Sequence, residues 1–175
     1  MAERAVADAG PLIWLARCGL LDVLRQSYSS VLMPPAVRHE VIDRGVEGGH
    51  SDAALVSVAL DEGWITIETS SKSHTKRTSD LADRMRVRIG GGETQAIALA
   101  LAEKAVLLTN DEDARAVARS MGLKTASVPR ILIDAVKLGL LTKEEARSAL
   151  SSMIDEGLWL SPAVVQLFNE LLERT

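Results

Sequence analysis

The sequence predicts an α/β fold in which helices cover both faces of a parallel β-sheet. Short apolar segments typical of buried strands alternate along the chain with segments whose apolar residues recur at helical spacing. Strands separated by helices pair in parallel through right-handed crossovers, and the helices then bury both faces of the sheet. The length of 175 residues suits one domain, and 47% hydrophobic but only 3% aromatic residues predict an aliphatic core.

The first half of the chain begins with a short apolar strand at residues 5–7, which ends at Asp8. Pro11 suits the first turn of a helix, so a helix is expected to follow. A strand at residues 30–33 stops at two prolines, the second of which opens a helix through about residue 43. The other elements expected here are helices at 20–24 and 52–60 and a strand at 64–68.

The second half begins with residues 68–88, where Ser, Thr, Lys and Arg replace most apolar residues. We expect this segment to be the most mobile, with a short helix at about residues 80–87. Thr142 and Glu145 have the spacing of a capping box at the start of a later helix. The other elements expected here are strands at 105–109 and 124–127 and helices at 93–104, 111–121, 129–138, 143–155 and 162–172.

Charge and cysteine content exclude several classes of protein. A net charge of -4 argues against a protein that coats nucleic acid through a global positive field. The single cysteine, Cys18, excludes an internal disulfide framework and a zinc site built on several thiolates. The apolar runs are shorter than the ~20 residues of a membrane helix, and no apolar leader follows Met1. We therefore expect a cytoplasmic protein with no membrane partner.

Polar side chains follow two of the predicted strands at the point where each strand ends. Asp8 follows the first strand, while Asn110, Asp111 and Asp113 follow the strand at 105–109. The carboxyl ends of parallel strands meet at one edge of the sheet, and ligands bind outside that edge. The sequence therefore predicts a functional site where these side chains meet.

Two further carboxylates, Glu40 and Glu93, share helical faces with apolar residues. A carboxylate on a core-facing stripe costs stability unless something compensates its charge. A divalent ion at the strand ends would compensate several acids together, and hard oxygen ligands select Mg²⁺ or Mn²⁺ over zinc. The alternative for Glu40 is that its side chain turns out to water at the end of its helix.

The other acids also have explanations that involve no ligand. Asp8 can cap the first helix, and Glu93 at a helix start gains from the helix dipole. Thr109 and Glu112 have the spacing of a capping box, which would leave Asp111 as a solvated acid of the first turn. Four acids that converge on one edge of a sheet nevertheless indicate a ligand-binding site more specifically than any one of them does alone.

Four stretches of sequence carry a pattern beyond the single acids. They are Val6-Ala7-Asp8-Ala9-Gly10-Pro11-Leu12-Ile13, Met33-Pro34-Pro35-Ala36-Val37 leading to Glu40-Val41, Gly91-Gly92-Glu93-Thr94-Gln95-Ala96-Ile97 and Leu108-Thr109-Asn110-Asp111-Glu112-Asp113-Ala114-Arg115. In residues and spacing they resemble the PIN domain, and more narrowly its DUF3368 branch, which is related to VapC-type toxin nucleases. The resemblance covers nearly the whole chain. It implies a three-layer sandwich with a central parallel sheet of about four to five strands, as a nuclease domain at residues 1–140 with a C-terminal helical extension at 141–175.

The resemblance implies an endoribonuclease that hydrolyses RNA phosphodiester bonds with Mg²⁺ or Mn²⁺. Its implied catalytic acids are Asp8, Glu40, Glu93 and Asp111, and its implied metal ligands are Asp8, Glu93, Asp111 and Asp113. Thr109 and Asn110 are implied supporting residues, with the Thr109 hydroxyl expected to hold Asp111. The chain departs from the family pattern at Gly10, where a Ser or Thr is common, and at Asn110, where many members have an acid.

A basic segment at residues 72–88 precedes Glu93 and holds six basic and two acidic residues. Arg84, Arg86 and Arg88 are therefore candidates for contacts with RNA phosphates. The alternative is an ordinary solvated surface.

A second hypothesis is a PIN-like interaction partner or regulatory protein with weak catalysis. The family resemblance also implies the toxin of a toxin–antitoxin pair, with a small antitoxin as partner and a homodimer as assembly. Apolar residues of the C-terminal helices could supply such an interface: Leu158, Trp159, Leu160, Val164, Val165, Leu167 and Phe168. A phosphatase of the haloacid dehalogenase type is disfavoured, because it needs an Asp where this chain has Gly10.

Overall fold

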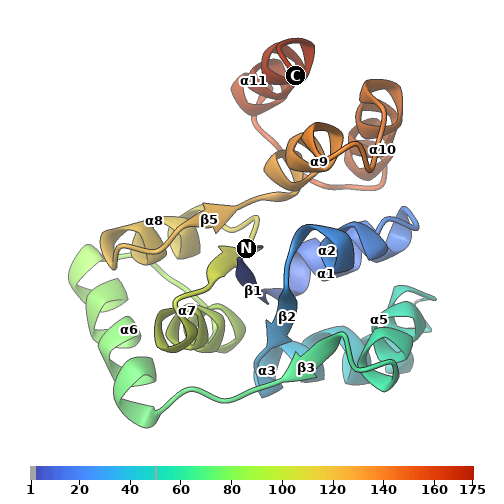
Figure 1. Cartoon of the computed structure of the whole chain (residues 1–175). Helices are drawn as coiled ribbons and strands as arrows, with labels where there is room; N and C mark the ends of the chain where they lie inside the picture. Colours follow the sequence, from blue (N-terminus) through green and yellow to red (C-terminus); the bar gives the residue numbers. More distant parts are fainter. Residues whose placement is uncertain (1–2, 50) are drawn as a thin grey trace.

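The centre of the molecule is a parallel sheet of five strands in the order β3-β2-β1-β4-β5, which confirms the expected fold class (Figure 1). The structure is a computed structural model that describes residues 3–49 and 51–175, so the expectation drawn from Met1 lies outside it. The strands are β1 (Arg4–Ala7), β2 (Ser30–Met33), β3 (Ile65–Ile67), β4 (Val106–Leu108) and β5 (Thr125–Ala126).

The helices form the two outer layers. They are α1 (Ala9–Arg17), α2 (Asp22–Ser27), α3 (Pro35–Arg38), the π-helical turn η1 (His39–Asp43), α4 (Arg44–Glu47), α5 (Ser51–Asp61), α6 (Lys72–Met85), α7 (Gly91–Glu103), α8 (Glu112–Ser120), α9 (Val128–Lys137), α10 (Lys143–Asp155) and α11 (Pro162–Glu173). Helices α6, α7 and α8 lie on one side of the sheet, and α1, α2 and α5 lie on the other (Figure 1).

The central strand β1 explains why both layers are needed. Its side chains alternate in direction, so Ala5 and Ala7 pack into one apolar core while Val6 packs into the other. All three are fully buried. Beyond the last residue of the strand, the backbone N–H of Asp8 donates to the carbonyl of Leu108 at 2.9 Å, which continues the β1–β4 pairing as far as the acid.

The segment at residues 68–88 differs from the prediction. In place of a short helix at about 80–87, the chain forms the longer helix α6. The Ser71 hydroxyl caps this helix by accepting a hydrogen bond from the backbone of His74. Thr78 and Ala82 are its buried residues, one helical turn apart, so a narrow stripe is enough to seat it against α7. The periodicity is weak in the sequence because one member of the stripe is a threonine.

Three local features of the helices bear on the prediction. Helix α1 begins at Ala9, before Pro11, because Asp8 is its N-cap. The helix expected through residue 43 contains the π-helical turn η1, which includes Glu40. The capping box of Thr142 and Glu145 is present as predicted.

The C-terminal helices α9, α10 and α11 gather at one end of the molecule (Figure 1). Buried side chains of α10 and α11, such as Leu150 and Phe168, belong to the same apolar core as α1 and β1. The division of the chain at residues 140 and 141 stays a prediction. No helix in the described part of the chain is long and apolar enough to cross a membrane.

Candidate active site

Asp8 is a buried carboxylate held at the end of the central strand. Only 6% of its surface is exposed. Its Oδ1 accepts a hydrogen bond from the backbone N–H of Ala9 at 2.8 Å, and its Oδ2 accepts one from the Thr109 hydroxyl at 2.8 Å. The expected capping role of Asp8 is therefore present, and the second bond fixes the carboxylate between β1 and β4.

Burial raises the pKa of Asp8 from its ordinary value of 3.8 to about 6. The hydrogen bonds from Thr109 and Ala9 lower this pKa, while the nearby charges of Glu93 and Glu40 raise it. The Asp8 carboxylate is therefore ionised at neutral pH at a cost that its two hydrogen bonds offset only in part. A bound cation would offset the rest of that cost.

The Thr109 hydroxyl joins the ends of two strands. It donates to Asp8 and accepts from the backbone N–H of Asp111 at 3.2 Å, and Thr109 itself is fully buried. The expected hydroxyl contact with Asp111 is therefore present, and it is made to the backbone N–H of Asp111. Thr109 holds the carboxylate of Asp8 and only the backbone of Asp111, because its hydroxyl points back toward β1.

Asp111 is the N-cap of α8, which corrects the capping box expected for Thr109 and Glu112. Its Oδ1 accepts a hydrogen bond from the backbone of Ala114 at 2.6 Å. Its Oδ2 makes no hydrogen bond to the described residues, so one oxygen remains available to a ligand. Asp113 lies in the first turn of α8 and is partly buried, and no described contact joins it to the other acids.

Glu40 and Glu93 approach Asp8 from two different helical segments. Glu40 is exposed in the π-helical turn η1, a feature frequent at functional sites, and Glu93 is half-buried in the first turn of α7. A Cβ atom at Gly92 would lie 3.3 Å from Glu40 Oε2 and 3.9 Å from Asp8 Oδ1. The lack of a side chain at Gly92 therefore leaves open the space between Glu40 and Asp8.

Sequence reasoning missed this role of Gly92. The run of glycines at residues 90–92 does not by itself indicate such a role, although Gly92 directly precedes an acid of the predicted site. Gly91, by contrast, has no atom within 4 Å of the position of a Cβ. The two neighbouring glycines therefore differ in the space around them, and only the three-dimensional structure shows this difference.

The chemistry of the donors fits a hard divalent cation. Asp8, Glu40 and Glu93 offer carboxylate oxygens, which Mg²⁺ and Mn²⁺ prefer, and Asp111 adds a free oxygen at the end of β4. Within residues 3–49 and 51–175, no group of three or more His, Cys, Asp or Glu side chains already stands close enough to hold an ion. The donor set therefore fits in chemical type, while its full coordination geometry is not formed.

The order of these motifs along the chain agrees with a known family. The sequence profile of DUF3368, described as PIN domain, matches residues 4–174. The chain belongs to this family.

Solved structures share the fold of this PIN domain. A chain of VapBC2 from Rickettsia felis, solved bound to a DNA fragment from its promoter, aligns with a TM-score of 0.52 at 16% identity, covering 71% of this chain and 98% of that one. A chain of VapBC-1 from nontypeable Haemophilus influenzae aligns with a TM-score of 0.55 at 14% identity, covering 71% and 97%. The search of curated proteins finds no match.

Asn110 has a structural role next to the acids of this PIN domain. Its Oδ1 accepts a hydrogen bond from the backbone N–H of Val128 at 2.9 Å, and its backbone carbonyl accepts one from Arg115 at 3.1 Å. Its Nδ2 is buried with no partner among the described residues. A Cβ at Gly10 would lie 3.4 Å from this Nδ2, so the two departures from the family pattern face each other.

The three candidate arginines lie at and after the end of α6. Arg84, Arg86 and Arg88 are all exposed, and Arg86 takes the left-handed conformation that ends the helix. Arg84 donates to the backbone carbonyl of Asp80 at 3.2 Å. No described contact links these side chains to the acids, so their role with RNA stays a prediction.

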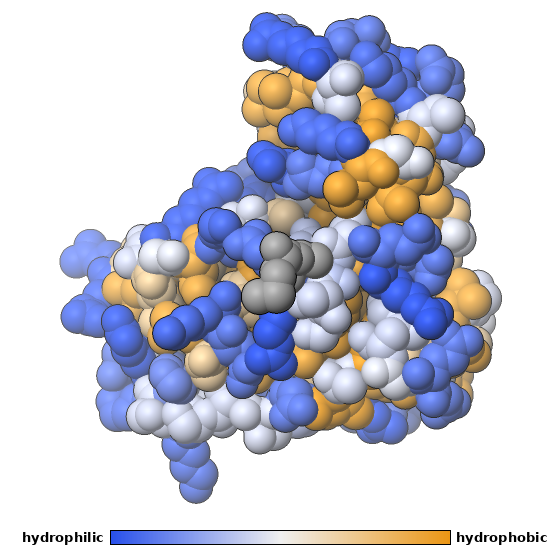
Figure 2. Space-filling model, in the orientation of Figure 1, coloured by the Kyte–Doolittle hydropathy of each residue, from blue (hydrophilic) through white to orange (hydrophobic). Residues whose placement is uncertain are grey.

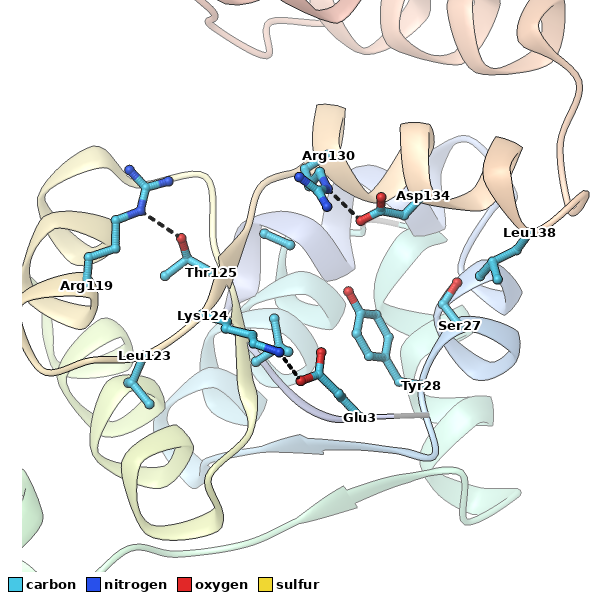
Figure 3. A pocket seen from close by; sticks show the side chains of 12 residues that line it. Glu3, Ser27, Tyr28, Arg119, Leu123, Lys124, Thr125, Arg130, Asp134 and Leu138 are labelled. Atoms are coloured by element: carbon cyan, nitrogen blue, oxygen red, sulfur yellow. Dashed lines mark hydrogen bonds and ion pairs between the residues drawn. The ribbon is translucent and has the colours of Figure 1, made fainter. Parts of the chain in front are cut away.

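A cavity of about 460 Å³ lies at the opposite edge of the sheet (Figure 3). Glu3 and Tyr28, just before β1 and β2, line it together with the first residue of β5. Lys124 pairs there with Glu3 and Arg130 with Asp134, while Arg119 donates to the Thr125 hydroxyl (Figure 3). None of the predicted catalytic or metal-binding residues lines this cavity, so it is separate from the candidate active site.

Proposed function

We propose that this PIN domain is a divalent-metal-dependent endoribonuclease that hydrolyses phosphodiester bonds in RNA. The observation that carries the proposal is the buried Asp8 carboxylate, whose charge is made costlier by burial and by the adjacent Glu93 and Glu40. A buried carboxylate with two further acids nearby, at the carboxyl edge of a parallel sheet, is suited to a divalent ion. Membership of the PIN domain family supports nuclease chemistry.

Each side chain has a proposed part in the reaction. Asp8, Glu93 and Asp111 would hold the metal, with Asp113 as a further ligand, and the ion would supply an acidified water and offset negative charge on the phosphate. Thr109 and the Ala9 N–H keep the Asp8 oxygens in place. Glu40 is exposed beside Gly92, where its side chain would orient the attacking water.

RNA phosphates are proposed to contact the exposed guanidinium groups of Arg84, Arg86 and Arg88. These residues precede α7, whose first turn carries Glu93. Replacing all three with glutamine should make RNA affinity less dependent on salt, because each lost phosphate contact reduces counterion release. An unchanged dependence of affinity on salt would assign them to the ordinary solvated surface.

The decisive experiment incubates purified protein with a pool of single-stranded and structured RNA in the presence of EDTA, Mg²⁺ or Mn²⁺. Wild-type protein should cleave RNA only with a metal ion, and Asp8→Asn and Asp111→Asn should each abolish cleavage. Asp155→Asn is the matched control, since Asp155 is an exposed acid of α10. Metal-dependent cleavage that survives Asp8→Asn would overturn the assignment, and RNA left intact by wild-type protein would favour the catalytically weak interaction partner.

A toxin role in a toxin–antitoxin pair is a second proposal. Its support is the fold shared with chains from two VapBC complexes. Growth arrest on expression of wild-type protein, relieved by Asp8→Asn, would agree with a nuclease toxin. A small antitoxin and a homodimer stay predictions, which co-purification and light scattering would test.

A further inference from the structure

A groove of about 330 Å³ lies between α8, α9 and α11. It begins at Asn110, the residue between Thr109 and Asp111 at the end of β4, and continues past Ser127 and Pro129 at the start of α9. Its far wall comes from α11 and the segment before it. The groove is therefore continuous with the edge of the sheet that carries the candidate active site.

The far wall presents an aromatic side chain to solvent. Trp159 is 77% exposed, and the apolar residues Leu167 and Leu171 of α11 are exposed beside the groove. Apolar residues also gather on the surface of the part of the molecule formed by the C-terminal helices (Figure 2). An exposed indole is a stacking platform that accepts any nucleobase, because every base has a π-face.

The same groove is lined by three arginines. Arg115 is paired with Glu112 at 3.6 Å, and Arg130 is paired with Asp134. Arg119 donates to the Thr125 hydroxyl at 3.2 Å and has no carboxylate partner among the described residues. Once Glu112 and Asp134 are set against the three guanidinium groups, the groove keeps one positive charge without an acidic partner, that of Arg119, on a chain whose net charge is -4. A polyanion complements it.

We infer that this groove binds the single-stranded RNA that flanks the cleaved bond, with a base stacked on Trp159 and a phosphate beside Arg119. The inference rests on the proposed nuclease function and names a substrate-binding surface for it. An aromatic platform combined with basic side chains is the usual way to bind single strands without reading their sequence. An apolar protein helix would use the apolar wall but would leave the arginines without phosphates.

The test measures the affinity of the full chain for a short fluorescent single-stranded RNA by anisotropy in EDTA, where the proposed nuclease does not cleave. Trp159→Ala should weaken binding roughly 5- to 100-fold, the range for the loss of one stacked base, and Trp159→Phe should restore most of it. Leu138→Ala is the matched control, because Leu138 is also exposed, at 57%, and lies beyond the end of α9 outside the groove.

A salt titration tests the arginines. Arg119→Gln should lower the slope of log affinity against log salt by about one, as expected for one lost phosphate contact. Arg25→Gln is its control, since Arg25 is an exposed arginine of α2 that pairs with Glu62. An Arg119→Gln slope equal to that of wild-type protein would remove the phosphate contact from the inference.

Cleavage by the same variants separates this inference from the proposed function. If wild-type protein cleaves RNA with metal and Asp8, and Trp159→Ala binds RNA as tightly as Leu138→Ala does, the inference is overturned and the nuclease stands. If Trp159→Ala changes only self-association, the groove is a protein interface and the inference also fails. Wild-type protein that neither binds nor cleaves RNA overturns both.

Discussion

A buried carboxylate such as Asp8 lowers the stability of the folded chain whenever it is ionised. Its pKa is about 6 in the folded protein and 3.8 ordinarily, so the folded state binds the extra proton between these values. The stability that this proton provides is present below pH 3.8 and is lost as the pH rises through about 6. The same residue is central to the proposed activity, so activity and stability oppose each other here.

Asp8→Asn should therefore raise the free energy of unfolding at neutral pH in EDTA, by less than the roughly 3 kcal/mol that the pKa shift represents, because the amide keeps only one of the two acceptor oxygens. The gain over wild-type protein should shrink toward about pH 4, where Asp8 is largely protonated. Urea denaturation of both chains at the two pH values measures the difference. An equal difference at acidic and neutral pH would contradict the raised pKa.

Gly92 and Gly91 provide a matched pair of substitutions at the start of α7. Gly92→Ala places a methyl group 3.3 Å from Glu40 Oε2, so it should push this carboxylate away and reduce metal-dependent cleavage roughly tenfold or more. Gly91→Ala meets no atom within 4 Å and should leave cleavage unchanged. Steady-state cleavage rates compare the two variants. Equal activity of both would show that Glu40 does not need the space beside Gly92.

At the scale of elements, the short strands β1 and β4 are tied together by a side chain as well as by their backbones. The Thr109 hydroxyl on one strand end bonds the Asp8 carboxylate on the other. Its loss leaves a buried carboxylate oxygen without a donor, which costs more than the bond itself contributes. Substitutions should therefore destabilise the junction of β1 and β4 most at the point where the candidate site lies.

Thr109→Val should lower the free energy of unfolding by about 1–3 kcal/mol, because it keeps the shape of the side chain but removes the donor to buried Asp8. Thr109→Ser retains a hydroxyl and should lose much less. Thermal and urea denaturation measure both effects. A valine variant as stable as the serine variant would mean that the hydrogen bond to Asp8 contributes nothing measurable.

Individual strands and helices also show which structural features the sequence patterns predict correctly and which they miss. The strand that ends at Asp8 and the strand before Pro34 are found from sequence because buried strands are continuous apolar runs. Helix α6 was predicted too short because its buried stripe is narrow and includes Thr78. The capping role of Asp111 was missed because Thr109 offers the same local spacing, and only the direction of its hydroxyl decides between the two.

At the scale of the whole molecule, the strand order decides which acids can meet. Strand β1 lies between β2 and β4, so Asp8 is central and the chain segments after both neighbours lie beside it. The sequence predicted this edge as the site, since parallel strands end together. It could not predict that Gly92 leaves room for the acids or that the full metal geometry is not preformed, because these depend on side-chain positions between distant segments.

The bond between Asp8 and Thr109 spans 101 positions along the chain. Asp8 leaves the ribosome early, but the hydroxyl that holds it arrives only after more than half of the protein has been made. A nascent or prematurely terminated chain that stops before Thr109 therefore has the first acid without its anchor. Because this contact joins residues so distant in sequence, the candidate site around Asp8 is not assembled until at least residue 109 has been made.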